Sequence, residues 1–336
     1  MSPSQCGKEL DNRFPGCMKG RIMYVIPFSL GAINGRYSKI GIELTDSEYA
    51  VLCMRIITRV SMRVFEALGD RDFIRCVHSV GVPLSGSDEN SENPSIRKDM
   101  VCWPCNPTKA FLVHRPCERE IWSFGSGFGT NSLLGRKSMG LRIASSIARD
   151  EGWLAEHMAV FCELHLFLSK LGIEGDDIAW LRIGEGGRLY AVNPEFGFFG
   201  IAPGLSKRTN SAVMTMLRKN SIFTNVAETS NGEFFWQGLE DEIKDKNVEI
   251  EDWTGSKWHI GDKSRPAHYN ARYIAPASQC PLMHHKWESS KGVPIDAILF
   301  GSRRPRGVPL VYETFSWQHG VFTGACLKSE VYSDGG

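Results

Sequence analysis

The sequence contains no long apolar run. Its most apolar stretch extends from Met158 to Ile173. Polar and charged side chains at Glu163, His165 and Lys170 interrupt it, whereas a membrane-spanning helix needs roughly 20 consecutive apolar residues. The stretch therefore predicts an internal helix, and we expect no membrane partner.

The N-terminal residues carry no recognisable targeting signal. Met1 to Asp11 has no apolar core of the kind found in signal peptides, and it contains acidic residues that transit peptides avoid. We therefore expect a cytoplasmic protein.

An excess of charge of one sign is also absent. The chain has 39 basic and 38 acidic residues, which gives a net charge of +1. Such a balance produces no field that gathers nucleic acid or an anionic membrane. We expect neither as a partner.

The ten cysteines form no disulfide framework, which indicates free thiols in a reducing compartment. Cys102 and Cys105 make the single CxxC motif of the chain. A zinc site would need a second pair of ligands at matching spacing. Packing is the simpler interpretation of these two cysteines, and a zinc protein built on them stays open as a minor alternative.

The chain does have the size and pattern of an α/β protein. Its 336 residues, 42% of them hydrophobic, can form two domains or one large domain. A strand is predicted at Ile22 to Phe28 and a helix at Glu48 to Arg63. A new segment opens near Gly152, so we predict domains at 1–150 and 151–330, followed by a mobile tail at 331–336.

Further elements are predicted from periodicity and turn residues. Asp177 to Asn193 is typical of a hairpin around the turn Gly184 to Gly187. The remaining predictions are an exposed loop at Ser85 to Pro94, a helix at Leu141 to Arg149, and strands at Ile222 to Glu228 and Ala297 to Phe300.

Two motifs suggest chemistry. Gly125 to Asn131 has glycine at every second position up to Gly129, which allows backbone N–H groups to point at one anion; a plain glycine turn is the alternative. Asp176 and Asp177 follow an apolar stretch, a placement that suits divalent cations, although aspartate pairs also occur at turns and helix caps. Without the other motifs, the simplest interpretation of Lys137 is a solvated lysine, and that of His157 is a core or surface histidine.

In this order, the glycine-rich turn, the lysine, the histidine and the aspartate pair resemble those of GTP-dependent phosphoenolpyruvate carboxykinase. Further matching segments are Arg13 to Gly20, Ile40 to Ser47, Asn193 to Glu195, Gly197 to Gly200, Pro276 to Pro281 and Ser316 to Phe322. The resemblance implies an α/β fold, in which an N-terminal mixed-sheet substrate domain precedes an incomplete nucleotide-binding and metal-binding domain.

The resemblance also implies roles for individual residues. A manganese ion is expected on Lys137, His157 and Asp177, and magnesium bound with GTP is expected on Asp176. The substrate contacts are expected to be Phe128, Gly129, Thr130, Asn270 and Arg272. Arg272 and Arg303 are the expected catalytic arginines and also face the nucleotide, with Arg303 on the transferred phosphoryl group.

The implied reaction converts oxaloacetate and GTP into phosphoenolpyruvate, carbon dioxide and GDP, in gluconeogenesis, on a monomer. The chain departs from the family pattern: it contains no GxxxxGK[ST] loop, and only 18 residues separate His157 from Asp176. The family usually has tyrosine at Phe128 and glycine at Thr130. We therefore expect impaired use of GTP. The alternative is an inactive protein that binds oxaloacetate or phosphoenolpyruvate, or a partner protein.

Overall fold

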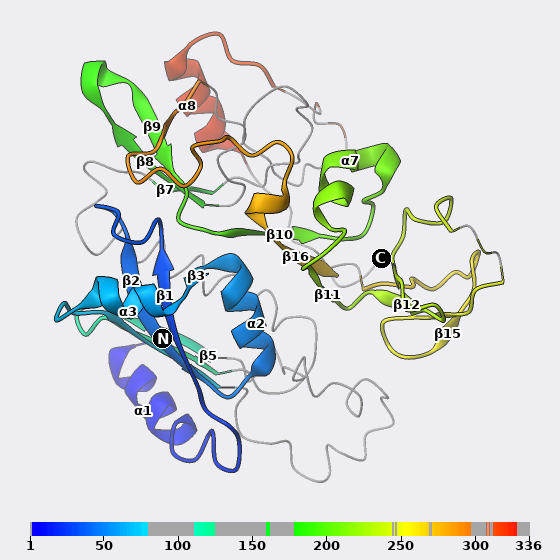
Figure 1. Cartoon of the computed structure of the whole chain (residues 1–336), viewed down its shortest axis with the longest axis horizontal. Coiled ribbons are helices and arrows are strands. Elements are labelled where there is room, and N and C mark those ends of the chain that lie inside the picture. The colour runs from blue at the N-terminus through cyan, green and yellow to red at the C-terminus, as the bar shows by residue number, and fades with distance from the viewer. Residues whose placement is uncertain are drawn as a thin grey trace.

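The N-terminal part of the chain folds around a six-stranded sheet in the order β3-β1-β2-β4-β6-β5 (Figure 1). In this computed structural model the described residues are 2–79, 111–124, 178–243, 245, 247–268, 271–296, 307, 309 and 312–327, with the backbone of 159–161. The strands of the sheet are β1 (Tyr24–Leu30), β2 (Lys39–Thr45), β3 (Arg59–Val60), β4 (Ile74–Ser79), β5 (Phe111–Arg115) and β6 (Glu120–Phe124). β2, β4 and β6 run parallel and the other pairs are antiparallel. The expected α/β fold with a mixed N-terminal sheet is confirmed.

Three helices accompany this sheet: α1 (Pro3–Arg13), α2 (Glu48–Ile57) and α3 (Met62–Leu68). At the start of α1, Ser2 and Gln5 form a reciprocal capping box. At the start of α2, the Ser47 side chain accepts a hydrogen bond from the Ala50 amide. Helix α2 contacts both β1 and β16 (Arg272–Pro276), so it lies between the N-terminal sheet and the sheet that contains β16 (Figure 1).

The helix predicted over Glu48 to Arg63 is too long. It ends at Ile57, a short strand β3 follows, and α3 begins at Met62. The hydroxyl of Thr58 donates to the Met54 carbonyl at 2.7 Å, which occupies an acceptor of the last helical turn. The next residues then pair with β1, because strand pairing with a distant segment outweighs the helical pattern.

A second sheet has the order β17-β9-β8-β7, built from β7 (Ala159–Phe161), β8 (Ile178–Ile183), β9 (Leu189–Val192) and β17 (Val293–Pro294). The predicted hairpin is confirmed, with Ile183 opposite Leu189 across a short 3-10 turn at Glu185–Gly187. The helix predicted from Met158 is wrong at its start, because Ala159–Phe161 is a strand antiparallel to β8. Antiparallel neighbours need no crossover helix between them.

Two further sheets complete the described strands. The first is β10-β16-β11, with β10 (Gly197–Ile201) and β11 (Ile222–Thr224); the second is β13-β12-β14-β15, with β12 (Ala227–Thr229), β13 (Phe234–Phe235), β14 (Ile250–Glu251) and β15 (Lys257–Trp258). The short strands predicted over Ile222 to Glu228 are confirmed as β11 and β12, which belong to different sheets. Asn225 between them has a φ of 56°, a left-handed conformation that breaks the strand.

The remaining described helices are α7 (Lys207–Met216) and α8 (Trp317–Cys326), and a 3-10 turn lies at Ala277–Gln279. Helix α7 packs its buried Val213 and Met216 against Phe198 and Tyr273 of the β10-β16-β11 sheet. In the part of the chain that the structure describes, no helix is long and apolar enough to cross a bilayer.

Backbone hydrogen bonds join the loop after β1 and the end of α2 to the segment between β9 and β10. The Gly31 amide donates to the Pro194 carbonyl at 2.8 Å, and the Phe196 amide donates to the Ile57 carbonyl at 2.6 Å. Trp180 of β8 also packs in one core cluster with Phe28 of β1. The two predicted halves of the chain therefore share a core.

Several predictions fall outside the described residues. They are the loop at Ser85 to Pro94, the helix at Leu141 to Arg149, the strand at Ala297 to Phe300, the domain boundary near 150, the tail at 331–336, and the CxxC motif of Cys102 and Cys105. These stay predictions.

Candidate functional site

Three parallel strands, β2, β4 and β6, end at one edge of the N-terminal sheet. Thr45 is opposite His78, and His78 is opposite Ser123; one step further, Ser79 is opposite Phe124. In α/β sheets, ligands bind outside the carboxyl ends of parallel strands. This edge is therefore the candidate site among the described residues.

A buried carboxylate marks the edge. Asp46 directly follows β2, and its side chain has no exposed surface. Arg21 Nη1 forms an ion pair with Asp46 Oδ2, and Ser79 Oγ donates to the same oxygen at 2.9 Å. Arg21 Nη1 also donates to the Cys17 carbonyl at 3.2 Å. The guanidinium thus neutralises the carboxylate and ties the N-terminal segment to the ends of β2 and β4.

A second polar pair lies beside the first. Thr45 Oγ1 and His78 Nδ1 are 2.7 Å apart, and the Ser47 amide donates to Thr45 Oγ1 at 3.1 Å. All three residues are buried. Because Ser47 also caps α2, the start of that helix is fixed at this edge.

Two buried thiols, that of Cys17 at the edge and that of Cys76 in the middle of β4, are held in the neutral form. Burial is the main cause that raises the pKa of Cys17, and a hydrogen bond with Ser79 offsets part of it. Burial, followed by the carboxylate of Glu43, raises the pKa of Cys76 well above its ordinary value. Since the thiolate is the nucleophilic form, neither side chain suits nucleophilic catalysis at neutral pH.

The predicted anion turn and aspartate pair lie outside the described residues. The residue directly before the turn and the residue directly after the aspartate pair are described. Gly125 directly follows Phe124 at the end of β6, and Asp177 directly precedes Ile178 at the start of β8. Ile178 shares one core cluster with Ile121 of β6. The two attachment points are therefore anchored in the same core.

Of the predicted site residues, the structure describes Arg272 alone. The others are Phe128, Gly129, Thr130, Lys137, His157, Asp176, Asp177, Asn270 and Arg303, and they lie outside the described residues. Their roles stay predictions, as do the manganese and magnesium sites. Within the described ranges, no group of three His, Cys, Asp or Glu side chains could hold a metal ion.

Arg272 is the first residue of β16, and its side chain is almost fully buried at 3% exposure. It pairs with Ile201 of β10 on one side and with Thr224 of β11 on the other. Its Cζ lies 5.5 Å from the centroid of the Phe199 ring, a cation–π contact. The guanidinium is thus fixed by a packed environment, as a residue that orients an anion needs to be.

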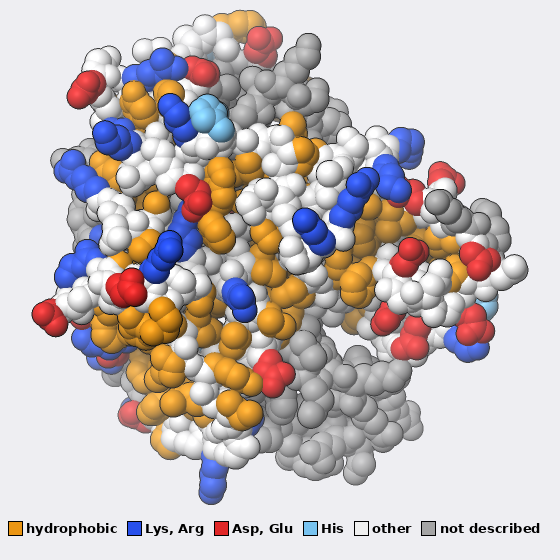
Figure 2. Space-filling view, viewed as in Figure 1, with side chains coloured by type: hydrophobic (Ala, Val, Ile, Leu, Met, Phe, Trp, Pro, Cys, Tyr) orange, Lys and Arg blue, Asp and Glu red, His pale blue; other side chains and the backbone are white. Residues whose placement is uncertain are grey.

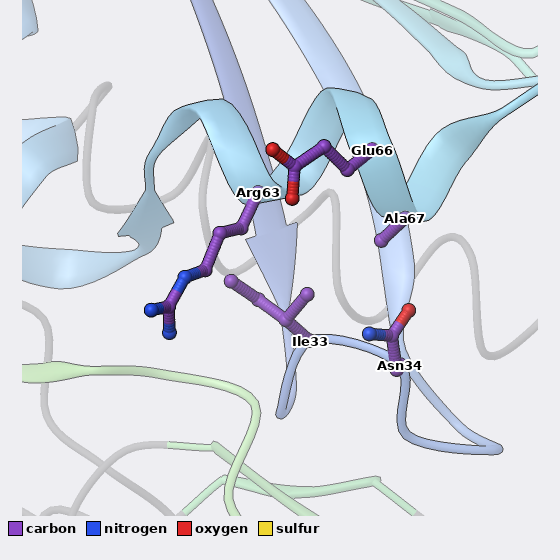
Figure 3. A pocket seen from close by; sticks show the side chains of 5 residues that line it. All are labelled: Ile33, Asn34, Arg63, Glu66 and Ala67. Atoms are coloured by element: carbon purple, nitrogen blue, oxygen red, sulfur yellow. The ribbon is translucent and has the colours of Figure 1, made fainter.

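A cavity of about 310 Å³ lies elsewhere, between α3 and the loop after β1. Its lining comprises Ile33, Asn34, Arg63, Glu66 and Ala67. Figure 3 shows the Arg63 guanidinium and the Asn34 amide on opposite sides of Ile33. Because the polar groups do not converge on one point, we assign this cavity no role.

Both halves of the chain match models of known protein families. Residues 1–149 match the model of the phosphoenolpyruvate carboxykinase N-terminal domain, and residues 165–334 match that of the phosphoenolpyruvate carboxykinase C-terminal P-loop domain. The chain belongs to the GTP-dependent phosphoenolpyruvate carboxykinase family. The resemblance noted from the sequence is confirmed.

Curated relatives in this carboxykinase family match nearly the whole chain. The chain is 58% identical to phosphoenolpyruvate carboxykinase [GTP] of Haemonchus contortus, over 98% of the chain and 56% of that protein. It is 54% identical to the Ascaris suum protein of the same name and 50% identical to the mitochondrial form of Homo sapiens, in each case over 98% of the chain and 54% of the relative. The chain thus spans little more than half the length of these carboxykinases.

The alignments with these relatives are longer than the chain. They extend over 357 to 359 positions, more than the 336 residues of this chain, so the relatives have residues with no counterpart here.

Relatives named as mitochondrial and relatives named as cytosolic both occur among the carboxykinases that match. The family match does not favour the inactive-binder alternative.

Arg21, Asp46 and Ser79 were not among the site residues predicted from the sequence. The polar residues Thr45, at the end of β2, and Asp46 and Ser47, directly after it, were a signal that could have indicated an edge site. No local signal identified Arg21 as the partner of Asp46, because the two lie 25 positions apart in the sequence.

Proposed function

We propose that the chain acts in the phosphoenolpyruvate carboxykinase reaction on oxaloacetate and phosphoenolpyruvate, with impaired use of GTP. The observation that carries this proposal is the 58% identity to a carboxykinase over 98% of the chain. The buried Arg272 supports it, because a fixed guanidinium suits the carboxylate or phosphate of these ligands.

The family reaction has two halves. In the first, the carbon–carbon bond to the departing carboxylate breaks, carbon dioxide leaves, and the electron pair forms an enolate. In the second, the enolate oxygen attacks the γ-phosphorus of GTP, and the bond to the β-phosphate oxygen breaks to release GDP. Positioning and electrostatics contribute most to such steps.

The proposed residue roles divide between these halves. Phe128, Gly129, Thr130, Asn270 and Arg272 hold the substrate anion, and Asp176 with Arg303 serves the nucleotide. Lys137, His157 and Asp177 supply amine, imidazole and carboxylate donors, a set that suits manganese. The ion, when bound, acts as a Lewis acid toward the ketone oxygen.

The sequence supports the proposed impairment in GTP use. The chain has no GxxxxGK[ST] loop, so it lacks the row of backbone N–H groups and the lysine that such a loop places around phosphates. The relatives also contain residues with no counterpart in this chain. With the second half impaired, protonation of the enolate to pyruvate is the proposed main outcome.

We propose a cytosolic monomer with no nucleic-acid or membrane partner. Cys6, Cys17, Cys76, Cys117 and Cys326 are free thiols, which suits a reducing compartment. On the face of the molecule in Figure 2, basic side chains are scattered among acidic and apolar ones and form no continuous stripe. Such a surface does not favour nucleic-acid binding.

The test compares oxaloacetate loss by wild type, His157→Ala and His285→Ala with manganese, above the background of free manganese. His285 is exposed and serves as the control histidine. We expect His157→Ala to lose most of the protein-dependent rate and His285→Ala to keep it. Equal rates for wild type and His157→Ala would contradict the proposed site.

Calorimetry with GTP and magnesium tests the impairment separately. We expect weak or undetectable binding. A micromolar dissociation constant, or formation of phosphoenolpyruvate from oxaloacetate and GTP, would show that GTP use is intact.

A further inference from the structure

Arg272 lies on the face of the β10-β16-β11 sheet that helix α2 covers. Residues opposite one another in antiparallel strands share a face, and so do residues two apart along a strand. Arg272 therefore shares its face with Ile274 of β16 and Phe199 of β10. Phe199 and Ile274 pack with Tyr49 of α2 in one buried cluster. The charge of Arg272 is thus buried where the N-terminal domain meets this sheet.

The Phe199 ring holds the guanidinium in this position. The distance from Arg272 Cζ to the ring centroid is 5.5 Å, within the roughly 6 Å range of cation–π contacts. Phe199 is 6% exposed and Arg272 is 3% exposed, so the contact is shielded from water, where such contacts are strongest. The ring itself cannot turn aside, because the helix packs on it.

A hydroxyl pair stabilises the other side of Arg272. The Tyr49 hydroxyl and Thr224 Oγ1 are 2.8 Å apart and buried. Thr224 is the residue of β11 that lies opposite Arg272. Helix α2 therefore fixes both the aromatic ring and the neighbouring strand that flank the arginine.

We propose that Phe199 is a positioning residue for Arg272. It acts on the ligand through the guanidinium, by restricting the rotamers of a long side chain before an anion binds. The inference rests on the proposed function, in which Arg272 binds the carboxylate or phosphate of oxaloacetate or phosphoenolpyruvate. Removal of the aromatic face weakens anion binding even when the fold is kept.

The neighbouring phenylalanine offers a matched control. Phe198 is 2% exposed and belongs to a different core cluster, with Val213 and Met216 of α7. Phe199→Leu and Phe198→Leu remove the same atoms from two buried positions on opposite faces of one strand. Phe199→Tyr keeps the aromatic face and tests for rescue.

The experiment measures the binding of phosphoenolpyruvate with manganese by calorimetry, and urea unfolding, for wild type and the three variants. We expect the two leucine variants to lose similar stability. Phe199→Leu alone should weaken binding by about threefold or more, because the Arg272 side chain must then be ordered when the anion binds. Phe199→Tyr should bind within about twofold of wild type. Equal binding by Phe199→Leu and Phe198→Leu would overturn the proposal.

A second measurement keeps the inference separate from the proposed function. If wild type does not bind phosphoenolpyruvate, the proposed function fails. The contact is then tested by a double-mutant cycle of Phe199→Leu and Arg272→Met in urea unfolding. A coupling of about threefold or more in the unfolding equilibrium constant supports the contact, and a coupling within experimental error overturns it.

Discussion

Arg59 of β3 and Glu288 form an ion pair across two distant parts of the chain, with 3.0 Å between Nε and Oε1. Arg59 Nη1 also donates to the Pro194 carbonyl at 3.0 Å. The guanidinium lies over the rings of Phe196 and Trp287, at 5.1 and 5.8 Å from their centroids. One buried arginine therefore connects the N-terminal sheet to two segments of the C-terminal half.

The first prediction concerns this arginine. Arg59→Met should lower the free energy of unfolding by about 2–4 kcal/mol, because it removes a charged hydrogen bond, an ion pair and two aromatic contacts. Glu288→Gln should cost only about 0.5–1 kcal/mol, because the Glu288 side chain is 49% exposed and Arg59 keeps its other contacts. Urea unfolding measures both, and equal losses would show that the ion pair dominates.

The second prediction concerns the buried pair at the sheet edge. Arg21→Met should destabilise the protein by about 3 kcal/mol, since it leaves the carboxylate of Asp46 buried without its cation. Adding Asp46→Asn to that variant should recover part of the loss, because no charge is then buried. Urea unfolding of the single and double variants gives the comparison. A double variant that is less stable than Arg21→Met would argue against charge burial as the cause.

The third prediction concerns close packing in the N-terminal sheet. Gly41 lies opposite Phe28, and a Cβ at Gly41 would be 2.4 Å from Cζ of that ring. Because Phe28 is 1% exposed and cannot move aside, Gly41→Ala should cost about 1–3 kcal/mol. Gly7→Ala in α1 is the control, since a Cβ there meets nothing within 4 Å. Thermal unfolding should separate the two variants, and similar melting temperatures would contradict the packing argument.

The fourth prediction concerns thiol reactivity. Cys117 and Cys326 are exposed, whereas Cys17 and Cys76 are buried and have raised pKa values. Iodoacetamide at pH 8 should therefore modify Cys117 and Cys326 before Cys17 and Cys76, as read by mass spectrometry. Early modification of Cys17 would contradict its burial.

The raised pKa of Cys76 also has a consequence for stability. A thiol whose folded pKa lies above its unfolded value contributes stability below about pH 9, and this contribution is lost as the pH rises through the folded value. The stability difference between wild type and Cys76→Ala should therefore shrink from pH 8 to pH 10 in urea unfolding. A constant difference would contradict the pKa shift.

The sequence by itself determined the α/β class, the hairpin around Gly184 to Gly187 and the carboxykinase family. Those features depend on local periodicity, turn residues and short motifs. Each of these signals lies within a short contiguous stretch of the sequence. The composition likewise gives a net charge of only +1, which is too small to attract nucleic acid.

The tertiary structure alone decided where α2 ends and which buried charges meet. Arg59 lies 229 positions from Glu288 in the sequence, and no local pattern connects them. The same holds for Arg21 with Asp46 and for Arg272 with Phe199, whose contacts exist only after the strands have paired. The burial of a charge and the choice of its partner depend on which distant segments fold against each other, and periodicity does not encode that choice.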